Sequence, residues 1–257
     1  MSVSLTSTVK ELAVTIPGAT RVFERLGIDY CCGGGRTLAD ACQEFRVPVE
    51  EVVRSLEAAG NAVNPGDDLR DWQSESLAAL SAHIVDTHHG FAREELARLE
   101  KLIDKVSARH GEKHTELLEL SHVCQRLKRE LLPHMLKEEQ VLFPYIARLE
   151  EAVSEGREPQ PPFFATVRNP VRMMMAEHDV AGDLLREVRR LTVDYQLPLD
   201  ACASYQTLYQ ALMEFEADLH QHIHLENNIL FPRAVEVETR AQPEWQALAD
   251  RHQCFGH

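Results

Sequence analysis

A histidine followed four residues later by a glutamate occurs twice in this chain, and each time Phe-Pro comes five residues after the glutamate. The two copies are His134 with Glu138 and His222 with Glu226, and the second lies 88 residues after the first. Residues four apart lie on one face of an α-helix, one turn above each other. Each copy therefore predicts a helix that presents an imidazole and a carboxylate side by side.

A lone histidine also precedes each copy. His89 lies 45 residues before the first copy and His178 lies 44 residues before the second, so the chain has two similar halves. Two helical hairpins packed face to face would bring four imidazoles and two carboxylates together, which is the ligand set of a two-metal site in a four-helix bundle. The sequence thus predicts an all-α, up-down four-helix bundle with the metal ligands His89, His134, Glu138, His178, His222 and Glu226.

Apolar residues at alternating three- and four-residue steps mark the inward seam of a bundle helix, and all six candidates fall on such seams. A single buried histidine is more often an ordinary core residue. Six polar side chains on four seams would each cost about 1–3 kcal/mol if they had no partner, and bound metal would remove that penalty. The first two predicted seams are Ala82, Val85, His89, Ala92, Leu96, Leu99, Ile103 and Val106, and Leu120, Cys124, Leu127, Leu131, His134, Glu138, Val141 and Tyr145.

The remaining histidines of the long helices are excluded from the site. His110 continues the first seam, but it lies 21 residues after His89, about 31 Å along an unbroken helix. Gly111 is a natural helix stop, so we expect His110 at the turn, far from the metals. Five others fall off the seams and are expected on the surface or just outside the coordination sphere: His83, His88, His122, His220 and His224.

The ligand types indicate iron. Structural zinc favours closed tetrahedral Cys/His sets, whereas imidazoles mixed with carboxylates suit iron or manganese. If Glu138 and Glu226 each bridge, every metal has four protein bonds and keeps room for an oxo or hydroxo bridge and a small ligand. Ferritin-like sites use Glu-x-x-His with more carboxylate. The pattern is closer to a hemerythrin-like centre, so the expected cofactor is two iron ions with an oxo or hydroxo bridge.

Composition bears on location and partners. The formal net charge of −14 disfavours nucleic acid and anionic membranes. No apolar stretch approaches the roughly 18–20 residues that span a membrane, and the N-terminus lacks the layout of a signal peptide. Six cysteines in 257 residues do not suggest a disulfide framework. We expect a cytoplasmic protein without nucleic-acid or membrane partners, and the sequence leaves a homodimer open.

The chain divides at residues 58–68, a run of turn formers without periodicity. We expect a small helical domain over residues 1–60, the bundle over residues 69–240 and a tail over residues 241–257. Prolines forbid helix in the loop that joins the two halves of the bundle, near residues 154–162. In the small domain, helices are expected over residues 17–27, from a capping box at Thr37 and Asp40, and over residues 48–60.

Adjacent cysteines stand out in the small domain. Cys31 and Cys32 precede three glycines and a predicted helix N-terminus, whose dipole, with nearby Arg36, would favour thiolate. Thiolate binds iron and exchanges with disulfides. The alternative is two buried small side chains beside a flexible turn. Three other cysteines fit helix interiors and are expected to serve packing: Cys42, Cys124 and Cys202.

Two motifs in this order, Asp29-Tyr-Cys-Cys-Gly-Gly34 and His222-x-x-Leu-Glu226-Asn-Asn-x-Leu-Phe-Pro232, resemble the repair-of-iron-centres (Ric, ScdA/YtfE-type) family of di-iron proteins. The resemblance covers nearly the whole chain and implies the same six iron ligands. It also implies repair of iron–sulfur clusters damaged by nitric oxide or peroxide in the bacterial cytoplasm, with damaged iron–sulfur proteins as clients. Cys31 and Cys32 would then hand the metal on.

Two other functions stay open at this point. The di-iron position could reduce nitric oxide to nitrous oxide, with Glu130 and Glu177 as proton carriers. Alternatively, the bundle could be a sensor that reversibly binds oxygen or nitric oxide, in which case the cysteine pair would be dispensable.

Overall fold

The computed structural model describes residues 3–60 and 70–241, and within them the secondary structure is helical apart from an isolated bridge between Thr8 and Thr37. The all-α prediction is therefore confirmed. No helix in these ranges is long and apolar enough to cross a membrane. Most of the predicted linker and the predicted tail, from residue 242 on, lie outside the described residues.

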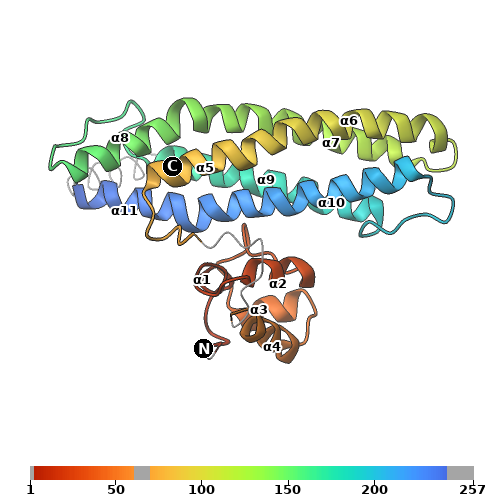
Figure 1. The fold of residues 1–257 in the computed structure, drawn as a ribbon, viewed down its shortest axis with the longest axis horizontal. Helices are drawn as coiled ribbons and strands as arrows, with labels where there is room; N and C mark the ends of the chain where they lie inside the picture. The colour runs from red at the N-terminus through yellow and green to blue at the C-terminus, as the bar shows by residue number, and fades with distance from the viewer. Residues whose placement is uncertain (1–2, 61–69, 242–257) are drawn as a thin grey trace, which may run out of the picture. The chain divides into compact units, whose positions relative to one another are not determined.

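The chain forms two compact units. The first contains the N-terminal helices together with the segment His220–Pro232, and the second contains Leu77–Leu219 together with the helix that continues from Arg233. Figure 1 shows the long helices of the second unit.

Four short helices build the N-terminal part of the first unit: α1 (Val9–Thr15), α2 (Ala19–Leu26), α3 (Leu38–Glu44) and α4 (Val49–Gly60). Gly27, in the left-handed conformation, ends α2 as expected. Helix α1 was not expected, although Thr8 and Glu11 form a complete capping box at its start. The helices share one hydrophobic core that includes Phe23 and Leu56.

Four long helical rods make up the bundle, and three of them change their winding along the way. The rods are α5 (Leu77–His83), η1 (Ile84–His89) and α6 (Gly90–His110); α7 (Glu116–Lys137), η2 (Glu138–Leu142) and α8 (Phe143–Ser154); α9 (Arg168–Thr192); and α10 (Ala203–His224), η3 (Leu225–Leu230) and α11 (Phe231–Ala241).

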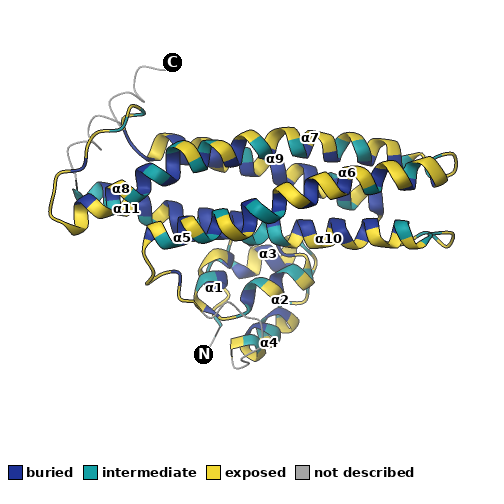
Figure 2. Ribbon diagram, turned by 45° about the horizontal axis from the view of Figure 1, so that its top comes forward, coloured by how far each residue is buried: buried dark blue, intermediate teal, exposed yellow. Residues whose placement is uncertain are grey.

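The rods pack through their apolar faces. Helix α7 contacts both α6 and α9, and partly buried polar pairs connect α10 to the other rods. The Arg189 guanidinium on α9 donates to Glu216 on α10 at 2.8 Å. On the other side, His88 on η1 and Asp218 on α10 lie 2.9 Å apart. Figure 2 shows the buried stripes of the long helices facing inward and their exposed stripes facing out.

Each of η1, η2 and η3 is a π-helix, in which every turn contains about one extra residue. Two of them lie immediately before a Phe-Pro pair, with Pro144 and Pro232 in the next turn. Proline lacks the backbone N–H and its ring crowds the carbonyl four residues earlier, so a widened turn relieves both problems. Such turns are frequent at functional sites.

Near the π-helices, the residues that face the core differ from those of the predicted seams. Ala82 is exposed, and Val85 and Val141 are only half-buried. The buried positions are instead Ile84 and Leu142. A regular 3.6-residue period cannot be carried through a π-turn, because the extra residue rotates everything on one side of it relative to the other.

Candidate metal centre

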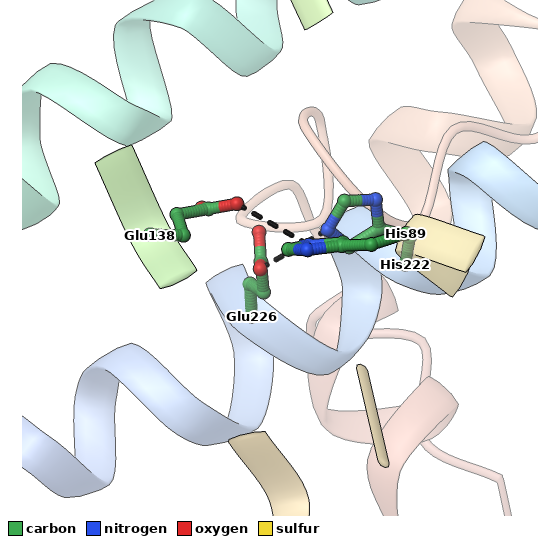
Figure 3. Close-up of side chains that lie close together, drawn as sticks. All are labelled: His89, Glu138, His222 and Glu226. Atoms are coloured by element: carbon green, nitrogen blue, oxygen red, sulfur yellow. Dashed lines mark hydrogen bonds and ion pairs between the residues drawn. The ribbon is translucent and has the colours of Figure 1, made fainter. Parts of the chain in front are cut away.

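The structure brings the six predicted ligands together as two overlapping groups. His89 and His222 form one group with Glu138 and Glu226, and the other contains the same two glutamates with the residues His134 and His178. In each group, ligand atoms from all four residues lie within 4.8 Å of one another. All six side chains are at most 2% exposed. Figure 3 shows the first group, with both carboxylates directed at the imidazoles.

Three of the six predicted ligands lie on π-helices. Glu138 begins η2, Glu226 is the second residue of η3, and His89 ends η1. The two i, i+4 pairs form as expected. His134 Nε2 lies 3.2 Å from Glu138 Oε1, and His222 Nε2 lies 3.1 Å from Glu226 Oε1.

Outer carboxylates fix the orientation of two imidazoles. His134 Nδ1 lies 2.7 Å from Glu177 Oε2, and His89 Nδ1 lies 2.7 Å from Glu139 Oε1. An imidazole that donates its Nδ1–H to a carboxylate presents the lone pair of Nε2 on its other side, which is how metal-binding histidines are held. Sequence reasoning missed Glu139, whose only signal was its position next to Glu138.

The ring nitrogens that point into the site are placed to bind a cation. His134 Nε2 faces His178 Nε2 at 2.9 Å, and His89 Nε2 faces Glu138 Oε2 at 3.4 Å. If His134 and His89 donate their Nδ1–H to the outer carboxylates, the Nε2 of each is an acceptor, so a proton or a metal ion must lie between the two atoms of each pair. Two buried carboxylates shared between four imidazoles are a donor set suited to a pair of iron ions.

The outer carboxylates are held in their charged form. The hydrogen bond from His134, helped by the ammonium group of Lys137, lowers the pKa of Glu177 to about 2 despite partial burial. Burial tends to raise the pKa of Glu139, but hydrogen bonds from Arg93 and His89 outweigh it and keep that pKa below the ordinary value. At neutral pH both groups therefore accept hydrogen bonds.

Comparison with known proteins assigns the family. The hemerythrin HHE cation binding domain model matches residues 80–234, and the ScdA_N model, described as a domain of unknown function, matches residues 5–60. A Haemophilus influenzae protein named "Probable iron-sulfur cluster repair protein" is 37% identical over 227 residues, covering 88% of this chain and 96% of the relative. Proteins named "Iron-sulfur cluster repair protein YtfE" from Yersinia pseudotuberculosis and Yersinia pestis match equally well. The chain belongs to the YtfE-type family. The resemblance seen in the sequence is confirmed.

The other histidines in the described part of this YtfE-type chain lie outside both groups. His122 is exposed, the first of the two expected positions, whereas two others are buried and therefore not on the surface. His88 is buried against Asp218. His224 is also buried, its Nδ1 lies 2.8 Å from the Asn228 amide, and desolvation lowers its pKa to about 4.

Two further residues considered in the sequence, Glu130 and His110, also lie outside the two groups. Glu130, predicted as a proton carrier, is exposed on α7 and belongs to neither group. His110 is the last residue of α6, as expected for a position at the turn, and it also belongs to neither group.

The cysteine loop of this YtfE-type chain differs from the expectation of exposed thiolates. Cys31 is buried and Cys32 half-buried, with their sulfurs 3.9 Å apart and no disulfide between them. The hydrogen bond to Cys32, burial and the nearby Asp29 carboxylate raise the pKa of Cys31 well above its ordinary value. Arg36 pairs with Glu44 at 3.0 Å. The local field at Cys31 therefore favours thiol, and the electrostatic prediction is wrong there.

Within the first unit, the cysteine loop contacts the segment that follows His222. The Asn228 amide donates to the Tyr30 carbonyl at 2.9 Å, and the Asn227 amide donates to the Cys31 carbonyl at 3.4 Å. The Tyr30 ring also packs edge-on against His224, with the ring centroids 5.5 Å apart. The two asparagines of the YtfE-type motif thus hold the backbone of the cysteine loop beside the residues next to Glu226.

Proposed function

We propose that this chain binds two iron ions through His89, His134, Glu138, His178, His222 and Glu226, and that it repairs damaged iron–sulfur clusters in client proteins by supplying iron. The observation that supports this most directly is the pair of buried four-residue groups that share both glutamates. The names of the relatives give the biological role.

In this proposal the two shared glutamates bridge the metals, and each metal takes two further imidazoles. A bound iron pair would supply exchangeable, redox-active metal. The outer carboxylates Glu139 and Glu177 orient two of the imidazoles, those of His89 and His134. Burial of all six ligands keeps bulk water from competing for the metals.

Cys31 and Cys32 would receive iron as cargo on its way to the client. A thiol must lose its proton to bind a metal. The Cys31 thiol donates to Asp29 Oδ1 at 3.4 Å, and the same oxygen accepts from the backbone N–H of Cys32 at 3.0 Å. Asp29 is thus placed to take the thiol proton while it keeps the loop in shape.

The test uses an enzyme whose iron–sulfur cluster has been nitrosylated, incubated with the iron-loaded full-length chain. We expect recovery of its activity with the wild-type chain and with His122→Gln, which changes an exposed histidine on α7. Glu138→Ala should fail because it cannot hold the metals. The double variant Cys31→Ser/Cys32→Ser should keep its iron yet restore little activity, whereas Cys42→Ala, a cysteine of the same unit outside the loop, should behave as wild type.

Two results would contradict the proposal. Repair by the Glu138→Ala variant at the wild-type rate would show that the metal centre is not needed. Full repair by the cysteine double variant would leave the di-iron centre in place but remove the delivery role of the loop.

A further inference from the structure

A third group of potential ligands lies at the other end of the bundle, entirely within the second unit. It consists of His110, His114 and Asp200, with one ligand atom from each within 4.8 Å of the others. His110 lies 21 residues after His89 along a continuous helical rod, so the group is about 31 Å from the first centre. Nothing in the proposed repair function uses it.

Two turns bring these side chains together. After α6 ends, the His114 N–H donates to the His110 carbonyl at 2.9 Å, which places the two imidazoles side by side with ring centroids 6.0 Å apart. Asp200 comes from the loop between α9 and α10. The fully buried Tyr205 ring packs 5.4 Å from His110 and 5.5 Å from His114, and so forms a rigid floor under both.

His114 is held as a metal-binding histidine is held. Its Nδ1 lies 2.9 Å from Glu116 Oε1 and its Nε2 lies 2.9 Å from Asp200 Oδ1. If Nδ1–H donates to Glu116, the Nε2 lone pair faces another acceptor, and positive charge is required between them. A proton on His114 would meet that need by making an ion pair, so this contact alone does not indicate a metal.

His110 supplies an independent observation. Only 8% of its surface is exposed, and its Nε2 has no hydrogen-bond partner among the described residues. Buried polar atoms are nearly always paired, so each exception calls for an explanation. Protonation of His114 would leave His110 unexplained, whereas a cation beside both rings would engage them together.

A cysteine lies next to this group without belonging to it. Cys202 lies just before α10 and is half-buried, which corrects the prediction that it packs inside a helix. Its thiol hydrogen-bonds with the His110 ring and with the backbone N–H groups of Tyr205 and Ser204, and these contacts lower the pKa of Cys202 to about 7. The sulfur therefore lies next to the His110 ring, outside the group of three.

We propose that His110, His114 and Asp200 bind one zinc-like divalent cation, with His114 oriented by Glu116 and the neighbouring Cys202 thiol turning in as a fourth donor, at the end of the bundle remote from the di-iron centre. Two imidazoles, a carboxylate and a thiolate are the donor types of tetrahedral zinc. Binding releases the thiol proton of Cys202 and any proton on His114 to the solvent. The ion would tie the turn after α6 to the loop before α10.

The test adds Co²⁺ to the iron-loaded full-length chain and follows the absorption spectrum, with metal content measured after dialysis. We expect one Co²⁺ per chain beyond the irons, with tetrahedral ligand-field bands and a thiolate-to-cobalt charge-transfer band, all lost when Zn²⁺ displaces Co²⁺. His114→Gln and Asp200→Asn should abolish this uptake. Glu116→Gln should weaken it by about tenfold, and the control His122→Gln should match wild type. Iron content should be the same in every variant.

The cysteine variants assign the sulfur ligand. Cys202→Ser should remove the charge-transfer band, whereas Cys31→Ser/Cys32→Ser should leave it unchanged. The proposal is overturned if no cobalt binds, if His114→Gln and Asp200→Asn bind it as wild type does, or if the band is lost only with the Cys31 and Cys32 variant. Asp200 and Cys202 are partly exposed, so their conservative replacements should preserve the fold, and circular dichroism checks this.

Discussion

His178 Nε2 lies 2.9 Å from His134 Nε2, although the two residues come from different halves of the repeated sequence. His134 also contacts the outer carboxylate of Glu177, the neighbour of His178 in sequence. Two consecutive residues of α9 thus contact the same imidazole, one at each ring nitrogen. The orientation of His134 therefore depends on the register between α7 and α9.

The first prediction concerns the shared glutamates. Glu138→Gln should lower iron content from about two to near zero per chain, because Glu138 belongs to both groups. His89 belongs to only one group, so His89→Gln should lower the iron content by about one iron per chain. Elemental analysis after dialysis measures both. Equal losses in the two variants would argue against bridging, and a single tightly held zinc in the wild type would end the di-iron interpretation.

The second prediction concerns the outer carboxylates. Glu177→Gln and Glu139→Gln should each weaken iron binding by about 10- to 100-fold, since each fixes the orientation of a ligand imidazole. Competition with a chelator gives the affinities. Glu130→Gln, an exposed position on the same helix as His134, serves as the control and should change nothing. An equal effect of all three would mean that only net charge matters.

The third prediction separates the two metal sites. His110→Gln should keep the full iron content and the oxo-bridge absorption, while its uptake of Co²⁺ falls. Loss of iron in this variant would show that His110 reaches the di-iron centre, contrary to its position at the end of α6.

The fourth prediction concerns stability at the end of the bundle where α8 and α11 meet. Glu238 is buried and accepts from the Tyr145 hydroxyl at 2.6 Å and from the Val167 backbone N–H at 2.9 Å. Glu238→Ala would leave both donors buried without an acceptor, at about 1–3 kcal/mol each. Chemical denaturation should show a loss of that order, and Tyr145→Phe a smaller one. No change would mean that water replaces the carboxylate.

The repeat itself made the helical bundle predictable, because ligand chemistry and helical spacing impose the same period on His134 with Glu138 and on His222 with Glu226. What could not be predicted depends on tertiary contact. Glu139 acts on a histidine 50 residues away, and the burial of Cys31 follows from the packing of its own unit. Ala82 and Val85 were misplaced because no regular period describes a π-helix, although Phe-Pro after η2 and η3 marked two of the three.

The π-helices also limit how this centre can be moved or altered. Winding η2 as a regular α-helix while keeping all five of its residues would rotate all of α8 by about 100° relative to α7. Phe143, Tyr145 and Ile146, now in the core, would turn toward solvent. The spacing between Glu138 and Pro144 is therefore as fixed as the identity of the ligands, and a transplant onto straight helices would need the extra residues as well as the side chains.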